Sequence, residues 1–346
     1  MEFCGGHTHT IFRHGIQDLV PANVRFIHGP GCPVCVLPMG RIDGVIELVQ
    51  SHDVIVCTYG DVMRVPASNR NNLHKAKARG GDIRMVYSAL DVLEVARQNP
   101  QREVVFFAIG FETTTPPTAV LIERIKKLNI KNLSVICNHV ITPAALLALL
   151  TCDYSEQIQF NGILGPSHVS TIIGISPYQN IAAQYHKPIV IAGFEPLDVL
   201  QSALMLIRQI NESRADVENE YSRAVSNGGN RQAMDLIDRV FTLRESFEWR
   251  GLGRLPHSAL KIRPEYVEFD AECRFEFNDT SGKEIKGCEC PAILRGQKTP
   301  RDCKLFGSVC RPDNAMGACM VSSEGACAAE WAYGRHRQST VTNRFS

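Results

Sequence analysis

The chain has 346 residues and is almost neutral, with 37 Lys and Arg against 36 Asp and Glu. Single hydrophobic cores stop growing near roughly 250 residues, so more than one domain is expected. With 21% charged residues and no run of like charge, the composition excludes a disordered chain and a polybasic surface, and we expect no nucleic acid among the partners. No apolar run reaches the ~18 residues of a membrane span, and the first residues lack the basic and apolar regions of an export signal. We therefore expect a cytoplasmic protein without membrane contact.

Up to about residue 210, short apolar runs alternate with segments of helical spacing. The runs that predict strands are 24–28, 53–58, 83–87, 103–109, 133–138, 162–164 and 188–192. The segments that predict helices are 42–51, 71–79, 89–98, 118–128, 143–150 and 196–210. Continuous apolar strands that alternate with helices are typical of parallel βαβ units. The sequence therefore predicts an α/β protein with mainly parallel sheets.

The pattern also suggests how the chain is divided. One doubly wound sheet of seven strands is possible, but a break near Asn99-Pro100 favours two α/β domains, 1–98 and 99–210. Residues 211–250 are polar with helical spacing and are expected to connect these domains to the tail. Residues 251–346 lack regular alternation and are rich in Gly, Pro and Cys. A segment with so little apolar periodicity needs a covalent or metal staple, so we expect a small irregular C-terminal domain.

Thirteen cysteines are the unusual feature of the composition. An odd number without an export signal argues against a disulfide framework and favours metal binding or redox chemistry. Three cysteines lie near the start and six lie in the last sixty residues, so two thiol clusters need an explanation. Cys57, Cys137 and Cys152 lie in apolar runs and are expected to be small core residues.

The tail cysteines have spacings of 14, 6 and 16 residues between Cys288, Cys303, Cys310 and Cys327, with Cys290 and Cys319 as further candidates. Structural zinc is the alternative, but zinc sites usually contain Cys-x2-Cys pairs, which this segment lacks. Dispersed thiolates in a region without its own core favour an iron–sulfur cluster held by four cysteines.

Two further cysteine motifs lie near the start. Cys32-Pro-Val-Cys35 follows a predicted strand and precedes a helical segment, and a helix N-terminus stabilises a thiolate. This favours a redox or soft-metal role, with a zinc half-site or an inert pair as the alternatives. Cys4-Gly-Gly-His-Thr-His9 combines one thiol with two imidazoles, a donor set that suits iron, nickel, copper or zinc. We expect metal contact at Cys4 and hydrogen-bonding roles for the histidines, the alternative being solvated histidines in a disordered N-terminus.

Polar residues also follow several of the predicted strands, namely Asp61, Glu112, His139, His168 and Glu195. If their loops share one sheet edge, these side chains would meet in a single cleft, where they could orient ligands or move protons. Taken singly, each of these residues is expected to be a cap or turn residue rather than a functional one. Phosphate-binding loops of the Gly-x4-Gly-Lys and Gly-x-Gly-x2-Gly types are absent from the sequence.

Five strings together carry a resemblance to a known family. They are Cys4-Gly-Gly-His-Thr-His9, Gly29-Pro-Gly-Cys-Pro-Val-Cys35, Thr58-Tyr-Gly-Asp61, Gly110-Phe-Glu-Thr-Thr114 and Gly317-Ala-Cys-Met-Val-Ser-Ser-Glu-Gly-Ala-Cys327. From Met1 to about Arg335 the chain resembles the HypD family of hydrogenase maturation factors. The resemblance implies two α/β domains and a C-terminal domain with a [4Fe-4S] cluster. It also implies a cytoplasmic scaffold that, with the small partner HypC and the cyanide supplier HypE, assembles the Fe(CN)2CO group of [NiFe]-hydrogenase.

Carried over by residue, the resemblance gives each motif a role. Cys4 resembles the thiolate that holds the transient iron together with a HypC cysteine, and His7 lies in the same motif. Cys32 and Cys35 resemble a redox-active dithiol, and Glu112 lies in the Gly-Phe-Glu motif of the family. The cluster ligands implied are Cys288, Cys303, Cys310 and Cys327. These roles describe a redox-active assembly scaffold rather than a free-standing enzyme. The alternatives are a cluster-dependent thiol–disulfide reductase and a zinc-stapled binding protein.

Overall fold

The computed structural model describes residues 1–151, 160–277, 282 and 284–334. The chain forms two compact units, and each is assembled from separate stretches of sequence. The first unit consists of Met1–Cys35, Leu146–Gly229 and Gly287–Ser346, and the second of Val36–Ala145 and Asn230–Lys286. Both contain parallel sheets with helices, which confirms the predicted α/β class.

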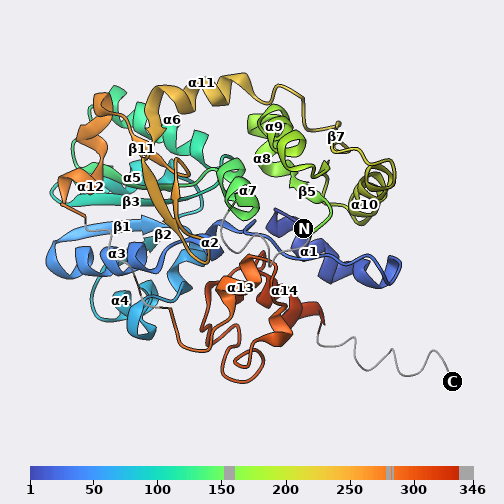
Figure 1. Cartoon of the computed structure of the whole chain (residues 1–346). Coiled ribbons are helices and arrows are strands. Elements are labelled where there is room, and N and C mark those ends of the chain that lie inside the picture. Colours follow the sequence, from blue (N-terminus) through green and yellow to red (C-terminus); the bar gives the residue numbers. More distant parts are fainter. Residues whose placement is uncertain (152–159, 278–281, 283, 335–346) are drawn as a thin grey trace. The chain divides into compact units, whose positions relative to one another are not determined.

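The second unit contains a four-stranded parallel sheet of order β2-β1-β3-β4 (Figure 1). Its strands are β1 (Val54–Thr58), β2 (Asp82–Met85), β3 (Glu103–Gly110) and β4 (Leu133–His139). Every residue of β1 and β4 is buried, which explains why these strands appear in the sequence as unbroken apolar runs. Since β1 and β3 are hydrogen-bonded neighbours, Asn99-Pro100 lies on a connection within one sheet.

Helices and two short antiparallel ladders complete the second unit. The helices are α2 (Pro33–Val36, which begins in the first unit), α3 (Met39–Ser51), α4 (Leu73–Ala78), α5 (Asp91–Gln98), α6 (Thr115–Lys127), α7 (Thr142–Thr151, which ends in the first unit), α11 (Arg231–Val240) and α12 (Ala271–Arg274). The ladders pair β8 (Phe241–Leu243) with β11 (Leu260–Ile262), and β9 (Ser246–Trp249) with β10 (Gly253–Pro256). Residues 211–250 therefore contain strands as well as the expected helix. Cys57 and Cys137 are buried in the core, as expected, while Cys152 lies outside the described residues.

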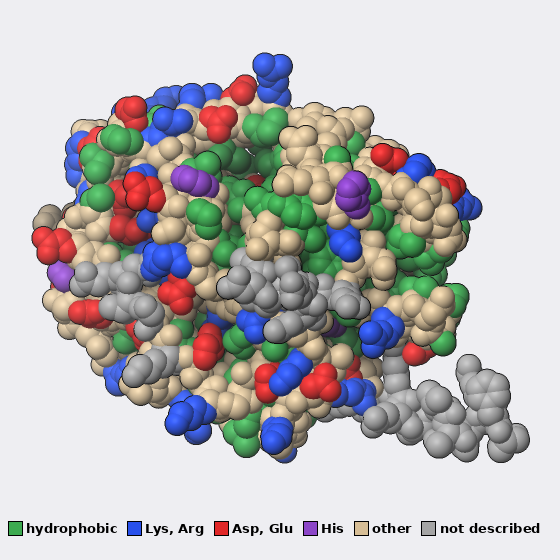
Figure 2. Space-filling view, viewed as in Figure 1, with side chains coloured by type: hydrophobic (Ala, Val, Ile, Leu, Met, Phe, Trp, Pro, Cys, Tyr) green, Lys and Arg blue, Asp and Glu red, His purple; other side chains and the backbone are tan. Residues whose placement is uncertain are grey.

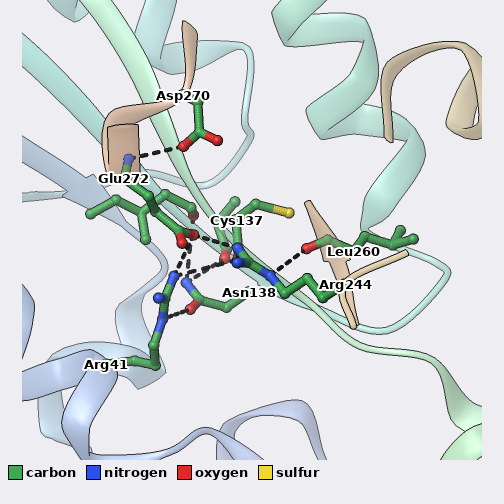
Figure 3. A network of polar contacts seen from close by, with 9 residues as sticks. Arg41, Cys137, Asn138, Arg244, Leu260, Asp270 and Glu272 are labelled. Atoms are coloured by element: carbon green, nitrogen blue, oxygen red, sulfur yellow. Dashed lines mark hydrogen bonds and ion pairs between the residues drawn. The ribbon is translucent and has the colours of Figure 1, made fainter. Parts of the chain in front are cut away.

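A buried charge network joins three elements of the second unit (Figure 3). The Glu272 carboxylate on α12 accepts hydrogen bonds from Arg41 on α3 at 2.6 Å and from Arg244 at 2.5 Å. Arg41 also donates to Asn138 on β4 at 2.5 Å. Burial alone would raise the pKa of Glu272, but the two guanidinium groups hold it at about 2. The carboxylate therefore stays ionised between its two arginines.

The first unit contains a parallel sheet of order β5-β6-β7. Its strands are β5 (Ile163–Pro166), β6 (Ile189–Ala192) and β7 (Val217–Asn219). The N-terminal residues extend this sheet, because Glu2 forms parallel bridges with Leu164 on one side and with His28 on the other. Phe3 N–H donates to Leu164 O at 3.1 Å, and Gly29 N–H donates to Glu2 O at 2.9 Å. The run 24–28 contributes only this bridge and not the strand that the sequence predicts.

Helices of the first unit are α1 (Gly5–His14), α8 (Ser167–Ile173), α9 (Ser176–Tyr185), α10 (Pro196–Asn211), α13 (Cys290–Leu294) and α14 (Ala326–Ala329). Helix α1 is not predicted from the sequence, since it begins with two glycines, which are poor helix formers. It ends at Gly15, whose left-handed backbone lets its N–H reach the carbonyls of Ile11 and Phe12. The tail from Gly287 has only short elements, including η7 (Ala318–Met320), and this confirms the predicted irregular C-terminal region.

The surface mixes both charge signs. On the face drawn in Figure 2, Lys and Arg side chains are interspersed with Asp and Glu, as the near-zero net charge implies. Among the described residues, none of the helices has the length and apolar character needed to cross a bilayer.

Candidate functional site

Four loops of the first unit leave the same edge of its parallel sheet. Cys4 follows the bridge at Glu2, and the Gly29–Cys35 turn follows the bridge at His28. His168 lies two residues after β5, and Phe194 lies two residues after β6. Ligands of open parallel sheets bind at the carboxyl ends of the strands, so this edge is the expected place for chemistry.

Cys4 is the N-cap residue of α1 and is buried. Its backbone N–H donates to Glu2 Oε2 at 3.0 Å, and its Sγ lies 4.0 Å from Nδ1 of His168. Burial raises the pKa of the Cys4 thiol well above its usual range, and the nearby carboxylates of Glu324 and Glu2 raise it further. The free thiol therefore stays protonated, and a bound cation would have to displace that proton, as metal binding to cysteine generally does.

Glycines explain why the chain can pack so closely around Cys4. A Cβ atom on Gly31 would collide with the backbone of Phe3 and Cys4, and Gly5 N–H donates to Gly31 O at 3.1 Å. A Cβ atom on Gly6 would lie 2.6 Å from the Phe194 ring. The Cys4 motif and the Gly29–Cys35 turn thus touch through backbone atoms, which only glycine permits at these positions.

His7 is buried one helical turn after Cys4. Because a carbonyl can only accept, its Nε2–H donates to Ala192 O at 2.8 Å, and its ring packs against Phe194 with centroids 5.1 Å apart. Burial lowers the pKa of His7, so the ring is neutral. Its Nδ1 is buried and has no hydrogen-bond partner among the residues that the structure describes. His7 therefore offers a lone pair to a ligand, whereas His9 stands edge-on to Tyr333 at 5.2 Å.

The Glu2 carboxylate links Cys4 to His28, the residue before the Gly29–Cys35 turn, through hydrogen bonds. Its carboxylate is buried and accepts hydrogen bonds from Cys4 N, from the Thr8 hydroxyl and from His28 Nδ1, the last at 2.8 Å. His28 directly precedes Gly29, and its ring stacks on Phe12. The sequence predicts no functional role for Glu2 or His28. The only signal was the position of Glu2 two residues before Cys4, which a single sequence cannot distinguish from chance.

Cys32 and Cys35 are joined as a disulfide at the start of α2. Both are buried, with 3% and 0% of their surface exposed. Cys35 Sγ lies 3.9 Å from the carbonyl oxygen of Ala318 in the tail. A small pocket beside the disulfide is lined by Thr8 of α1, by Gly29 and Gly31, and by the tail residues Ile293, Leu294 and Glu324–Ala326, among others. The disulfide is therefore in direct contact with the tail.

The tail cysteines lie close to one another. Cys319 N–H donates to Cys290 Sγ at 3.1 Å, and Met316 N–H donates to Cys310 Sγ at 3.4 Å. A Cβ atom on Gly317 would lie 2.5 Å from Cys288 Sγ and 2.8 Å from Cys290 Sγ. Backbone N–H groups directed at sulfur and a glycine that lets two sulfurs approach are compatible with a group bound by several of these thiolates.

The pKa shifts of these thiols show the same proximity. Burial raises the pKa of Cys310, and the charges of Cys288 and Cys303 add to the effect. The pKa of Cys327 is about 11: a hydrogen bond with Cys319 lowers it, but burial and three neighbouring thiols raise it more. Among the described residues, no group of three His, Cys, Asp or Glu side chains is placed so that it could hold one metal ion.

The remaining residues of the expected cleft have local roles. In the second unit, Glu112 accepts from Thr142 N and Oγ1, both at 2.8 Å, and so caps α7. His139 bonds to the Thr118 hydroxyl at 2.9 Å, while Asp61 accepts from Arg64 at 3.2 Å. In the first unit, Glu195 is exposed and forms the capping box of α10. Of the five residues expected to converge, the structure places His168 beside Cys4.

Fold and site together define a cysteine-rich α/β protein whose thiol, disulfide and tail cysteines share one unit. A model of the HypD family, described as "Hydrogenase formation hypA family", matches residues 1–334. The chain is 63% identical over 343 residues to the hydrogenase maturation factor HypD of Azotobacter vinelandii, covering 99% of this chain and 90% of that protein. It is 48% identical over 336 residues to HypD of Escherichia coli, covering 96% and 88%. The chain belongs to the HypD family of hydrogenase maturation factors.

Proposed function

We propose that this protein is the scaffold on which the Fe(CN)2CO group of a [NiFe]-hydrogenase is assembled. The iron is the substrate, and Cys4 holds it together with a cysteine of a HypC-like small chaperone. A HypE-like protein donates the cyanide ligands. Soft thiolates suit the electron-rich, low-spin iron that cyanide and CO produce. The protein acts in the cytoplasm.

One observation supports this proposal above the others. The Cys4 motif, the Cys32–Cys35 disulfide and the tail with its cysteines contact one another in turn within the first unit. The Cys4 motif touches the Gly29–Cys35 turn through Gly5 N and Gly31 O. The disulfide touches the tail through Cys35 Sγ and Ala318 O, and Ala318 directly precedes Cys319. A continuous path therefore joins the proposed iron ligand to the proposed cluster cysteines.

We assign the cluster to Cys288, Cys303, Cys310 and Cys327. A [4Fe-4S] cluster there would exchange one electron at a time. Opening the Cys32–Cys35 disulfide takes two electrons and two protons and yields two thiols, so an external one-electron reductant, such as a small iron–sulfur protein, must act twice. Cys32 and Cys35 then store the two electrons next to Cys4. The spacing of Cys35 from Ala318 gives them contact with the tail for this exchange.

The burial of the disulfide bears on the alternative function. A free-standing thiol–disulfide reductase must let the disulfide of another protein reach its own sulfurs. Cys32 and Cys35 are almost completely buried, so a protein substrate has no access to either sulfur in this conformation. The burial of both sulfur atoms therefore favours an internal electron relay over a free-standing reductase.

Infrared spectroscopy of the protein copurified anaerobically with its small chaperone tests the proposal. Cyanide and CO ligands absorb where proteins do not. We expect these bands in the wild-type complex and their loss in Cys4→Ala, while the iron of the cluster, about four per chain, stays unchanged. Cys57→Ala in β1, remote in sequence and located in the second unit, is the matched control and should keep the bands.

Bands that persist in Cys4→Ala would refute Cys4 as the iron ligand. Zinc in place of iron and sulfide in the purified wild type would refute the cluster assignment.

A further inference from the structure

The second unit carries a group of cations that the proposed function does not use. Residues 64–79 contain five Lys and Arg and no Asp or Glu, although the whole chain is nearly neutral. Arg64 pairs with Asp61, but the other four cations are exposed and form no ion pair with a described residue. These four, which we call the basic surface, are Arg70, Lys75, Lys77 and Arg79. We propose that the basic surface is a docking site for an acidic segment of a partner protein.

Hydrogen bonds bring three of these cations together around one turn. Lys75 Nζ donates to the Arg70 carbonyl oxygen at 2.6 Å, and Arg79 Nη2 donates to Asn71 Oδ1 at 2.8 Å. Both acceptors are uncharged, so neither balances the cations, and the repulsion between like charges favours an incoming anion. The composition argues against a polybasic protein, but it does not reveal this local cluster, because neutral residues separate the cations in the sequence.

The turn that carries Arg70 is strained and firmly held. Asn69 and Arg70 both have a left-handed backbone, with φ of 56° and 57°, which residues other than glycine seldom adopt. The Asp43 carboxylate fixes the turn, because it accepts hydrogen bonds from the Ser68 N–H at 3.0 Å and from the Ser68 hydroxyl at 2.7 Å. Strain of this kind persists only where the surroundings enforce it. The backbone of Arg70 is therefore positioned before a partner binds, which lowers the entropy cost of binding.

Two exposed apolar side chains lie at the end of the neighbouring strand. Helix α4, which carries two of the cations, packs against β2 and against the short helix η2 (Gly60–Arg64). Met85 ends β2, and its sulfur would lie 2.9 Å from a Cβ atom on Gly60. Met85 is 50% exposed, and Tyr87, two residues further on, is 87% exposed. Tyr, Met and Arg are enriched in protein interfaces, where aromatic side chains serve as anchors.

Exposure and charge together define the kind of partner. The four cations stand on an open surface, where a single ion pair contributes little, so binding needs several carboxylates from one molecule. A nucleic acid or an anionic membrane offers phosphates, but four cations are few for a phosphate backbone. The exposed Met85 and Tyr87 also match an apolar side chain, which a protein supplies. The surface therefore fits an acidic protein segment that carries an apolar residue.

Binding of a labelled acidic peptide to the purified full chain tests this surface. The probe alternates Glu with Gly around one central Phe, and its fluorescence anisotropy reports binding. We expect binding that weakens as the salt concentration rises, because the attraction is electrostatic. Lys75→Glu combined with Arg79→Glu should weaken binding by about tenfold or more. Arg124→Glu combined with Lys127→Glu reverses two exposed cations of α6 in the same unit, and this matched control should bind like the wild type.

Two further changes separate the charge from the fold and test the apolar contact. Lys75→Gln combined with Arg79→Gln keeps hydrogen-bond donors for the turn but removes both charges, so it should also weaken binding, and circular dichroism verifies the fold of every variant. Tyr87→Ala should weaken binding of the Phe peptide. It should leave unchanged the binding of a peptide with Gly in place of Phe, because that peptide offers no apolar side chain to Tyr87.

Three results would overturn the proposal. Wild-type affinity in the Lys75→Glu, Arg79→Glu variant would show that the basic surface does not bind the peptide. An equal loss in the Arg124→Glu, Lys127→Glu control would reduce the effect to net charge. Tighter binding of duplex DNA, or of vesicles of equal parts phosphatidylglycerol and phosphatidylcholine, through the same cations would replace the protein partner with a nucleic acid or a membrane. The measurement uses no iron, cyanide or chaperone, so its outcome is independent of the assembly function.

Discussion

The carboxyl edges of the two parallel sheets differ in what their polar side chains do. In the second unit, Glu112 and His139 are buried and bonded to Thr142 and Thr118 of their own unit. In the first unit, the corresponding edge carries a thiol, a disulfide and a buried His7 nitrogen without a partner in the described structure. Each edge leaves one buried histidine nitrogen without a partner among the described residues, His139 Nδ1 in the second unit and His7 Nδ1 in the first, but the first edge also carries a thiol and a disulfide.

This difference shows that position at a strand end is not enough to define a site. Both edges obey the rule that functional loops follow parallel strands, but only the first edge combines an unpartnered histidine nitrogen with a thiol and a disulfide. The hydroxyls of the Thr113–Thr115 segment illustrate the contrast, since Thr114 and Thr115 bond back to carbonyls of their own turn. Substitutions at the second edge should therefore lower stability, and those at the first edge should affect metal binding.

The largest effect is expected for Glu272→Gln in the second unit. The change leaves Arg41 and Arg244 buried without their carboxylate, and breaking such a pair costs about 3–5 kcal/mol. Urea unfolding followed by the fluorescence of Trp249, in a Trp331→Phe background that removes the other tryptophan, reports on this unit.

Glu272 should also make the free energy of unfolding depend on pH in the acid range. The pKa of Glu272 is about 2 in the folded protein, below its ordinary value of 4.5. Its stabilisation is therefore complete above pH 4.5 and is lost as the pH falls towards 2. The Gln variant should lack this dependence and keep the cyanide and CO bands of the complex. A loss of these bands would show that the edges are not independent.

A pH dependence of opposite sign is expected from Glu112. Burial raises the pKa of Glu112 to about 7, although hydrogen bonds from its own backbone and from Thr142 oppose the shift. A carboxyl group with a raised pKa stabilises the fold fully below pH 4.5, and this contribution is lost as the pH rises through 7. At 1.36 kcal/mol per unit, the difference amounts to about 3 kcal/mol.

Glu112→Gln should remove this dependence, because an amide does not ionise. The Trp249 unfolding curve between pH 5 and 8 measures it, and Trp249 packs against the neighbouring Phe111 at 6.0 Å between ring centroids. Equal pH profiles for the wild type and the variant would refute a buried, titrating Glu112. A loss of the cyanide and CO bands would instead indicate that Glu112 acts at the iron site.

Several strands of the two sheets could be predicted from the sequence, because a buried strand appears there as a continuous apolar run. The runs at 53–58, 103–109 and 133–138 predicted β1, β3 and β4 closely, since continuous apolar residues mark sheets covered on both faces. The contribution of Met1–Cys4 to the sheet was not predicted, because Glu2 alone forms its bridges and a single residue shows no periodicity. The division into two discontinuous units depends on long-range contacts that no local pattern records.

The sequence predicted candidate site residues by their type, but it did not predict which other residues contact and position them. Cysteine spacing and the Cys-Gly-Gly-His motif singled out Cys4, the Cys32–Cys35 pair and the tail cysteines as candidates, since an odd number of cysteines argues against a disulfide framework. The roles of Glu2, Thr8 and Phe194 were not predicted, because they arise only when segments far apart in the sequence meet. The functions of Gly5, Gly6 and Gly31 likewise become clear only from the atoms that a Cβ would meet.

The smallest effect on stability is expected where the first unit packs backbone against backbone. In Gly31→Ala the new Cβ meets the main chain of Phe3 and Cys4, which cannot move aside like a flexible side chain. Overpacking of this kind costs about 1–3 kcal/mol. Gly228→Ala in the same unit is the matched control, because no atom lies within 4 Å of its added Cβ.

Gly31→Ala should also displace Cys4 from His168 and from the disulfide, so its effect on metal binding should exceed its effect on stability. Hydrogen exchange of α1 measures the local stability, and the cyanide and CO bands of the complex with the small chaperone measure the site. We expect faster exchange in α1 together with weaker bands in Gly31→Ala, and wild-type behaviour in Gly228→Ala. If Gly31→Ala gave wild-type bands despite faster exchange, the close approach of the two motifs would serve packing alone, and the contrast between the two sheet edges would rest on Cys4 and His168 without the disulfide turn.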